Sequence, residues 1–152
     1  MSPWPDPLSY WATIVHILRM NRKYAPTIAD IYALANDARM RLPSSFIDKA
    51  LEVEFRVENM PNAVLLAEMK IEDAFDLTSV YEGIPLINKS SATKPDTPDI
   101  IWLFRRPILD EWASLGDVGL AELLAHIVVH QFSHHFGWSR RDVDEIVEWW
   151  AE

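Results

Sequence analysis

Four of the five histidines in the chain lie within one short stretch near its C-terminal end, L-L-A-H-I-V-V-H-Q-F-S-H-H-F-G, residues 123–137. His130 and His134 are four residues apart, so a helix would place both imidazoles on one face, one turn above the other. Two imidazoles arranged in this way can bind a single zinc ion. The spacing therefore predicts a metal-binding helix. The alternative is an amphipathic helix that merely contains many histidines.

The other two histidines of the stretch are less suited to the same ion. His126 precedes His134 by eight residues, which is about 12 Å along a helix axis, so it cannot share one ion with both His130 and His134. With His130 alone it forms a competing H-x-x-x-H pair. His135 points about 100° away from His134, which favours packing or a hydrogen bond to a substrate or a neighbouring group.

The central five residues differ at one place from a known zinc motif. H-Q-F-S-H matches H-E-x-x-H, in which two histidines bind zinc and the glutamate is the general base, except that Gln131 replaces that glutamate. A glutamine amide has nearly the shape of a carboxylate but no basicity. It can therefore hold a water molecule without accepting its proton. A hydrolytic zinc also needs a third protein ligand and an open position for water.

The composition is that of one globular domain. The chain has 152 residues, of which 49% are hydrophobic and 24% charged. Its net charge of −9 argues against nucleic-acid binding. It has no cysteine, which excludes disulfides, thiolate zinc ligands and a cysteine nucleophile. Neither an apolar leader nor an apolar run of about 20 residues is found, so we expect a soluble, cytoplasmic protein without membrane association.

Local signals predict several helices around the histidine stretch. Thr27 is expected to cap a helix that ends before Pro43, with Asp30 completing a capping box. Asp117 is the expected cap of the histidine helix, and Gly137 is expected to end it in a left-handed conformation. Further helices are predicted after Asp6-Pro7, around Phe46, after Pro61, from Pro107 to about Leu115, and from a cap at Ser139 to the end.

Strands are predicted from alternation and from β-forming residues. Residues 51–58 alternate apolar and charged side chains, which is typical of a half-buried strand. A second strand precedes a turn at Glu82-Gly83 and returns into a third, and residues 100–104 form a strand covered on both faces. The chain is predicted to consist of an N-terminal extension with one helix, residues 1–26, and a domain at residues 27–152.

Three segments together resemble one family. H-Q-F-S-H-H-F-G resembles the H-E-x-x-H-H-F-G signature of the minimal zincin-like metallopeptidases, a small bacterial family. L-T-S-V-Y-E-G-I-P-L resembles that family's L-L-G-L-Y-x-G-x-P-L hairpin, and P-D-I-I-W-L-F-R-R-P-I resembles the strand before its active-site helix. The resemblance covers about residues 27–145. It implies an α+β fold with a small, mostly antiparallel sheet beside the zinc helix.

The resemblance also implies roles for individual residues. His130 and His134 match the two histidine ligands, and Gly137 matches the glycine that turns the chain after the helix. The family's third ligand is an aspartate, where this chain has Arg140, a cation that cannot bind zinc. Asp142 is the nearest substitute ligand.

Two interpretations of function follow. The first is a zinc metallopeptidase whose hydrolysis is impaired or lost, a pseudoenzyme, because of Gln131 and Arg140. The second is a zincin-like module without metal that binds a peptide or protein partner. An acidic surface and tryptophans near both ends of the chain, Trp4, Trp11, Trp149 and Trp150, suit the second interpretation. Zinc-bound and metal-free forms are both compatible with the sequence.

Overall fold

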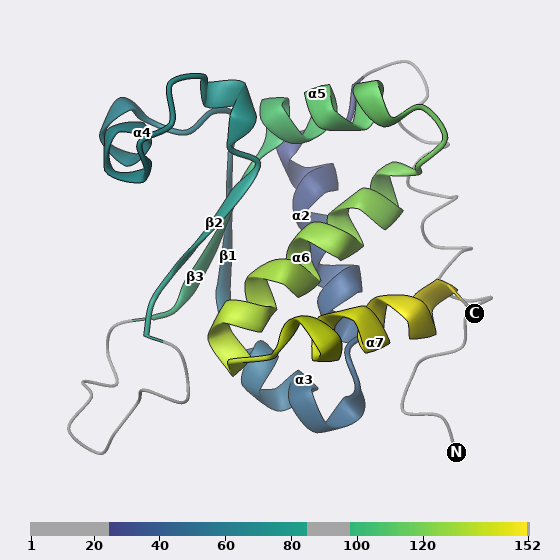
Figure 1. Ribbon diagram of the computed structural model, residues 1–152. Helices are drawn as coiled ribbons and strands as arrows, with labels where there is room; N and C mark the ends of the chain where they lie inside the picture. Colours follow the sequence, from purple (N-terminus) through teal and green to yellow (C-terminus); the bar gives the residue numbers. More distant parts are fainter. Residues whose placement is uncertain (1–24, 85–97, 152) are drawn as a thin grey trace.

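The computed structural model describes residues 25–84 and 98–151 (Figure 1). The predicted N-terminal helix, the return strand after Gly83 and the side chains of the four tryptophans named above lie outside the described part. The elements are α2 (Ile28–Met40), α3 (Ser44–Ala50), β1 (Glu54–Glu58), α4 (Ala63–Met69), a 3-10 turn (Ala74–Asp76), β2 (Ser79–Glu82), β3 (Ile100–Phe104), α5 (Arg105–Leu115), α6 (Leu120–Phe136) and α7 (Arg140–Ala151). Helices around a small sheet make this an α+β fold, as predicted.

The described strands form one sheet in the order β1-β3-β2. β3 pairs in parallel with β1 and antiparallel with β2, so the sheet is mixed rather than mostly antiparallel. The parallel pair arises because the chain passes through α4 and β2 between β1 and β3. Phe55, Tyr81 and Ile101 are register partners and therefore point to the same face of the sheet.

Helices α2 and α6 cover that face (Figure 1). α2 packs against β1 and α6, and α6 packs against β2. Phe132 of α6 is fully buried, and its ring meets that of Phe55 with centroids 5.9 Å apart. Burying a side chain of this size contributes about 1.5–3 kcal/mol. The sheet therefore fixes the rotation of α6, which decides where the histidines point.

Helix α6 starts two residues later than predicted and ends where predicted. Gly119, rather than Asp117, is its N-cap. Asp117 is part of the turn that ends α5, where its N–H donates to the carbonyl of Leu115. Gly137 ends the helix with φ 69°, and the N–H of Trp138 donates to the carbonyl of Ser133. The left-handed turn sends the chain into α7 across the end of α6.

The other helix and strand boundaries are set by hydrogen bonds between residues close together in the chain. The capping box of Thr27 and Asp30 is present, as predicted. β1 begins at Glu54 and not at residue 51, because residues 51–53 close the last turn of α3 with hydrogen bonds to the carbonyls of Ile47, Lys49 and Ala50. α5 begins at Arg105, two residues before Pro107, which is tolerated in the first turn because that turn leaves N–H groups unbonded. No helix in the described part is long and apolar enough to cross a membrane.

Candidate active-site helix

His130 and His134 lie side by side on the exposed side of α6. Their ring centroids are 5.4 Å apart and the rings are nearly perpendicular, at 88°. The ring of His134 also stacks on Tyr81 of β2 at 6.4 Å. Desolvation lowers the pKa of His134, and the charge of His130 lowers it further. These effects favour the neutral imidazole, which is the form that binds a metal ion.

The remaining two histidines of α6 face different surroundings. His126 is exposed, like His130 one turn later, so the competing H-x-x-x-H pair is also accessible. His135 is 1% exposed and lies between α6 and the sheet. The structure thus places three histidines at the surface of the helix and one inside.

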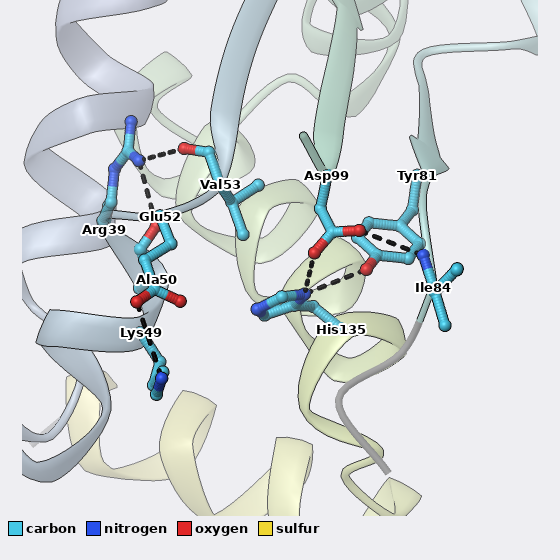
Figure 2. Close-up of polar contacts among 9 residues, drawn as sticks. All are labelled: Arg39, Lys49, Ala50, Glu52, Val53, Tyr81, Ile84, Asp99 and His135. Atoms are coloured by element: carbon cyan, nitrogen blue, oxygen red, sulfur yellow. Dashed lines mark hydrogen bonds and ion pairs between the residues drawn. The ribbon is translucent and has the colours of Figure 1, made fainter. Parts of the chain in front are cut away.

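His135 belongs to a buried polar network with Tyr81 and Asp99 (Figure 2). The Tyr81 hydroxyl lies 2.9 Å from Nδ1 of His135, and a carboxylate oxygen of Asp99 lies 3.5 Å from the same nitrogen. Burial raises the pKa of Tyr81, and the negative charge of Asp99 and a hydrogen bond to it raise that pKa further. Tyr81 therefore stays a neutral hydroxyl that connects α6 to β2.

The turn after β2 is built around Asp99. The other carboxylate oxygen of Asp99 accepts a hydrogen bond from the N–H of Ile84 at 3.0 Å. Gly83 has φ 156°, and a Cβ atom at this position would lie 2.1 Å from Oδ1 of Asp99. Only glycine leaves room for the carboxylate here. The residues before and after the undescribed segment 85–97 are therefore held together at Asp99.

Gln131 points inward, toward the edge of the sheet. Its side chain is 7% exposed, and its Nε2 donates to Oγ of Ser79 at 2.8 Å. Ser79 is the first residue of β2. The amide of Gln131, which stands at the position of the general base, thus joins α6 to β2.

Arg140, which stands where the resemblance implies the third ligand, and Asp142, the candidate substitute ligand, both lie at the start of α7. Arg140 is exposed. Asp142 forms a capping box with Ser139, in which its carboxylate accepts from the N–H of Ser139 at 2.9 Å and its own N–H donates to Oγ of Ser139 at 3.1 Å. These hydrogen bonds lower the pKa of Asp142. Its carboxylate therefore already has a structural role.

A catalytic zinc site needs three protein ligands. His130 and His134 fit two of these positions. Within residues 25–84 and 98–151, no three side chains of His, Cys, Asp or Glu lie close enough together to hold a metal ion. The donor set therefore fits a two-histidine site and does not fit a complete catalytic zinc centre. A role for Asp142 as third ligand stays a prediction.

Sequence reasoning did not single out Ser79, Tyr81 or Asp99. Tyr81 lies in the first and Asp99 in the second of the two family-like segments upstream of α6. The resemblance of these segments to the family was therefore the available indication that the two residues belong to the site. Ser79 lies in the same segment as Tyr81 but stands where the family pattern has glycine, so the resemblance did not point to it. Its bond to Gln131 joins residues 52 apart in the chain.

Removing the Tyr81 hydroxyl is expected to loosen the attachment of α6 to β2. Tyr81→Phe removes the hydrogen bond to His135 within a buried network, and we expect a loss of about 1–2 kcal/mol in the free energy of unfolding. Urea denaturation measures this loss. Tyr32→Phe is the matched control, because Tyr32 is 46% exposed, and it should change stability little. Equal effects of the two variants would contradict a structural role for the network.

The comparisons with known proteins agree with this geometry. A family model described as zincin-like metallopeptidase matches residues 50–150, which includes the sheet, the network and the whole of α6. A search of curated proteins finds no match. The match covers well over half of the chain, and the chain belongs to the zincin-like metallopeptidase family.

Proposed function

We propose that this member of the family has lost peptide hydrolysis and acts as a peptide-binding domain. The observation that carries the proposal is the state of Gln131. Its amide cannot accept a proton from water, and it is buried against Ser79 rather than directed to solvent. A general base must reach the proton that it removes and have a pKa suited to removing it. Gln131 meets neither requirement.

The first turn of α7, which follows α6, supports the same proposal. The family's aspartate is replaced by Arg140, and Asp142 is held in its capping box. A guanidinium near a metal ion opposes binding of that ion by charge repulsion. The base and the third ligand are therefore both missing from their expected positions.

Strand β2 is the element that we propose to bind the peptide. It is the last described strand on its side of the sheet and lies beside the histidine helix through the stacking of Tyr81 on His134. An extended peptide can add to such a strand through main-chain hydrogen bonds. The side chains of the peptide would then lie over the exposed histidines.

Selection from a random peptide library tests this proposal. A selected peptide carrying a photo-crosslinker should label β2, residues 79–82, and mass spectrometry should find the peptide uncut after incubation. Labelling of α5 provides the background. Crosslinks that avoid β2, or cleavage of the peptide by the unmodified protein, would each contradict the proposal.

A second candidate is a weak zinc hydrolase, which the closeness of His130 and His134 favours. When bound, zinc would polarise a carbonyl group and lower the pKa of a bound water molecule. In this chain the two imidazoles would hold the ion, and the helix would fix their spacing.

Zinc titration of the untagged protein separates the two histidine pairs. We expect His134→Ala to weaken zinc binding by about ten-fold or more, because it removes one of two nitrogen ligands. His126→Ala is the control and should leave the affinity unchanged. If His126→Ala has the larger effect, the competing pair binds the metal. If the unmodified protein binds no zinc, the second candidate is excluded.

A further inference from the structure

A cavity of about 410 Å³ lies on the face of the sheet opposite to α6, under helix α4. We name it the α4 groove. Its apolar lining comes from α4 and from the outward-facing side chains of β2 and β3: Val64, Leu65, Met69, Val80, Trp102 and Phe104. The volume lies within the range of small-molecule sites, about 300–1,000 Å³. The groove shares Val80, Tyr81 and Glu82 with strand β2, whose edge is the proposed peptide site, but it lies on the sheet face away from the histidines of α6.

Helix α4 is apolar but not buried. Its sequence A-V-L-L-A-E-M contains one charged residue, yet none of its residues is buried and Val64 is 68% exposed. The helix is nevertheless well formed, with the Asn62 side chain accepting from the N–H of Leu65 at 2.8 Å. Figure 1 shows α4 standing apart from the sheet, on the side away from α2 and α6. A helix with this composition ordinarily packs its apolar stripe against a core.

The charged residues that line the groove are all acidic. Glu58, Glu68 and Glu82 are among the residues that line it, and none of the lining residues is Lys or Arg. Glu82 also accepts a hydrogen bond from the Trp102 indole at 2.7 Å, which fixes the ring in the groove wall. Carboxylates around an apolar, aromatic floor favour a ligand that has a positive charge on an apolar body.

The side chain of Arg56, beside the groove, already makes a cation–π contact with Trp102. The guanidinium of Arg56 lies 5.4 Å from the centroid of the Trp102 ring. It is paired with Glu54 at 3.1 Å, and Glu54 and Glu82 both raise its pKa. The surface beside the groove thus stabilises a cation against Trp102.

We propose that the α4 groove binds a small organic cation with an apolar body, such as a hydrophobic amine. A small molecule suits the groove better than an extended peptide, because the main chain of β3 is already paired on both sides and offers few hydrogen bonds at the sheet face. An apolar anion of the same size is disfavoured by the three carboxylates.

The test uses 4-phenylbutylamine as the cationic probe and 4-phenylbutyrate as its anionic counterpart. Binding is followed through the indole N–H resonance of Trp102 in a proton–nitrogen spectrum, identified by its absence in Trp102→Phe. We expect the amine to shift this resonance with a Kd of about 1 mM or tighter, as for a ligand of few atoms. The butyrate should bind at least several-fold more weakly.

Variants locate the site and test the role of charge. Glu68→Gln and Glu82→Gln should each weaken binding of the amine by up to about five-fold, because each removes a partly exposed opposite charge. Glu122→Gln, which makes the same change on the exposed start of α6, should have no effect. Leu65→Trp, which fills the groove, should abolish binding, and the chemical shifts of the remaining core check its fold.

Three results would overturn the proposal. The first is equal binding of amine and butyrate, and the second is equal loss of affinity in Glu82→Gln and Glu122→Gln. The third is no shift of the Trp102 resonance with either probe at the concentrations tested. None of these results depends on hydrolysis, on zinc at α6 or on peptide addition to the edge of β2.

Discussion

The double variant Gln131→Glu with Arg140→Asp is expected to hydrolyse peptide bonds in the presence of zinc, where the unmodified chain stays at background. The first substitution replaces the amide that donates to Ser79 with a carboxylate, which cannot donate this hydrogen bond and can act as a general base. A general base typically contributes about 10²–10⁴-fold in rate. The second provides the carboxylate that the resemblance implies as third ligand and removes a cation from its neighbourhood. We therefore expect at least about 10²-fold over the unmodified chain, measured on casein or on a peptide mixture by mass spectrometry.

The two single variants show separately what the base and the third ligand contribute to hydrolysis. Gln131→Glu alone should give less activity than the double variant, since two histidines hold zinc weakly. Arg140→Asp alone should stay near background because the base is still missing. A double variant that binds zinc but does not hydrolyse peptides would show that the loss of activity has another cause. Hydrolysis by the unmodified chain would disprove the pseudoenzyme proposal directly.

Gly83→Ala is expected to lower the free energy of unfolding by about 2–4 kcal/mol, a large effect for the addition of one methyl group. The new Cβ would lie 2.1 Å from Oδ1 of Asp99. Either the turn or the carboxylate must move, and the carboxylate is held by the N–H of Ile84 and by His135. The positive φ of Gly83 adds strain for any residue with a side chain.

Thermal and urea unfolding of Gly83→Ala measure this effect. Gly119→Ala is the matched control, because a Cβ at Gly119 meets no atom within 4 Å and its φ is −71°. We expect the control to stay within about 1 kcal/mol of the unmodified protein. If both variants unfold alike, the packing of Asp99 against Gly83 has no special energetic role.

Local signals in the sequence predicted much of the helical structure. The capping box at Thr27, the helix end at Gly137 and the cap at Ser139 each depend on side-chain groups within a few residues of one another. The strand at residues 100–104 was predicted from a short run of β-forming residues and is present. These features need no knowledge of the rest of the chain.

The contacts that decide the site depend on residues far apart in the chain. Tyr81 and His135 are 54 residues apart, and Gln131 and Ser79 are 52 apart. The parallel pairing of β1 with β3 likewise joins segments about 46 residues apart, as in the register pair Phe55 and Ile101. Periodicity and capping rules describe neighbours along the chain, so they predicted the histidine face of α6 but not the direction of Gln131.

The start of α6 shows how one local signal can be overridden. Asp117 is a good capping residue, but Trp112 of α5 donates its indole N–H to the carbonyl of Val118 at 2.9 Å. This bond and the turn at Leu115 hold residues 116–118 as a connector, so the helix begins only after Gly119. The contact between Trp112 and Val118 thus explains why α6 begins later than the capping preference of Asp117 alone predicts.

The network of Tyr81, Asp99 and His135 determines which segments unfold together in local opening of the structure. It joins the last turn of α6, strand β2 and the start of β3 at one buried point. Opening any one of these segments must break the contacts of the other two, so they form a single cooperative unit for local unfolding. Amide hydrogens in all three segments would then exchange with solvent at similar rates, whereas those of α4, which has no buried residue, would exchange independently and faster.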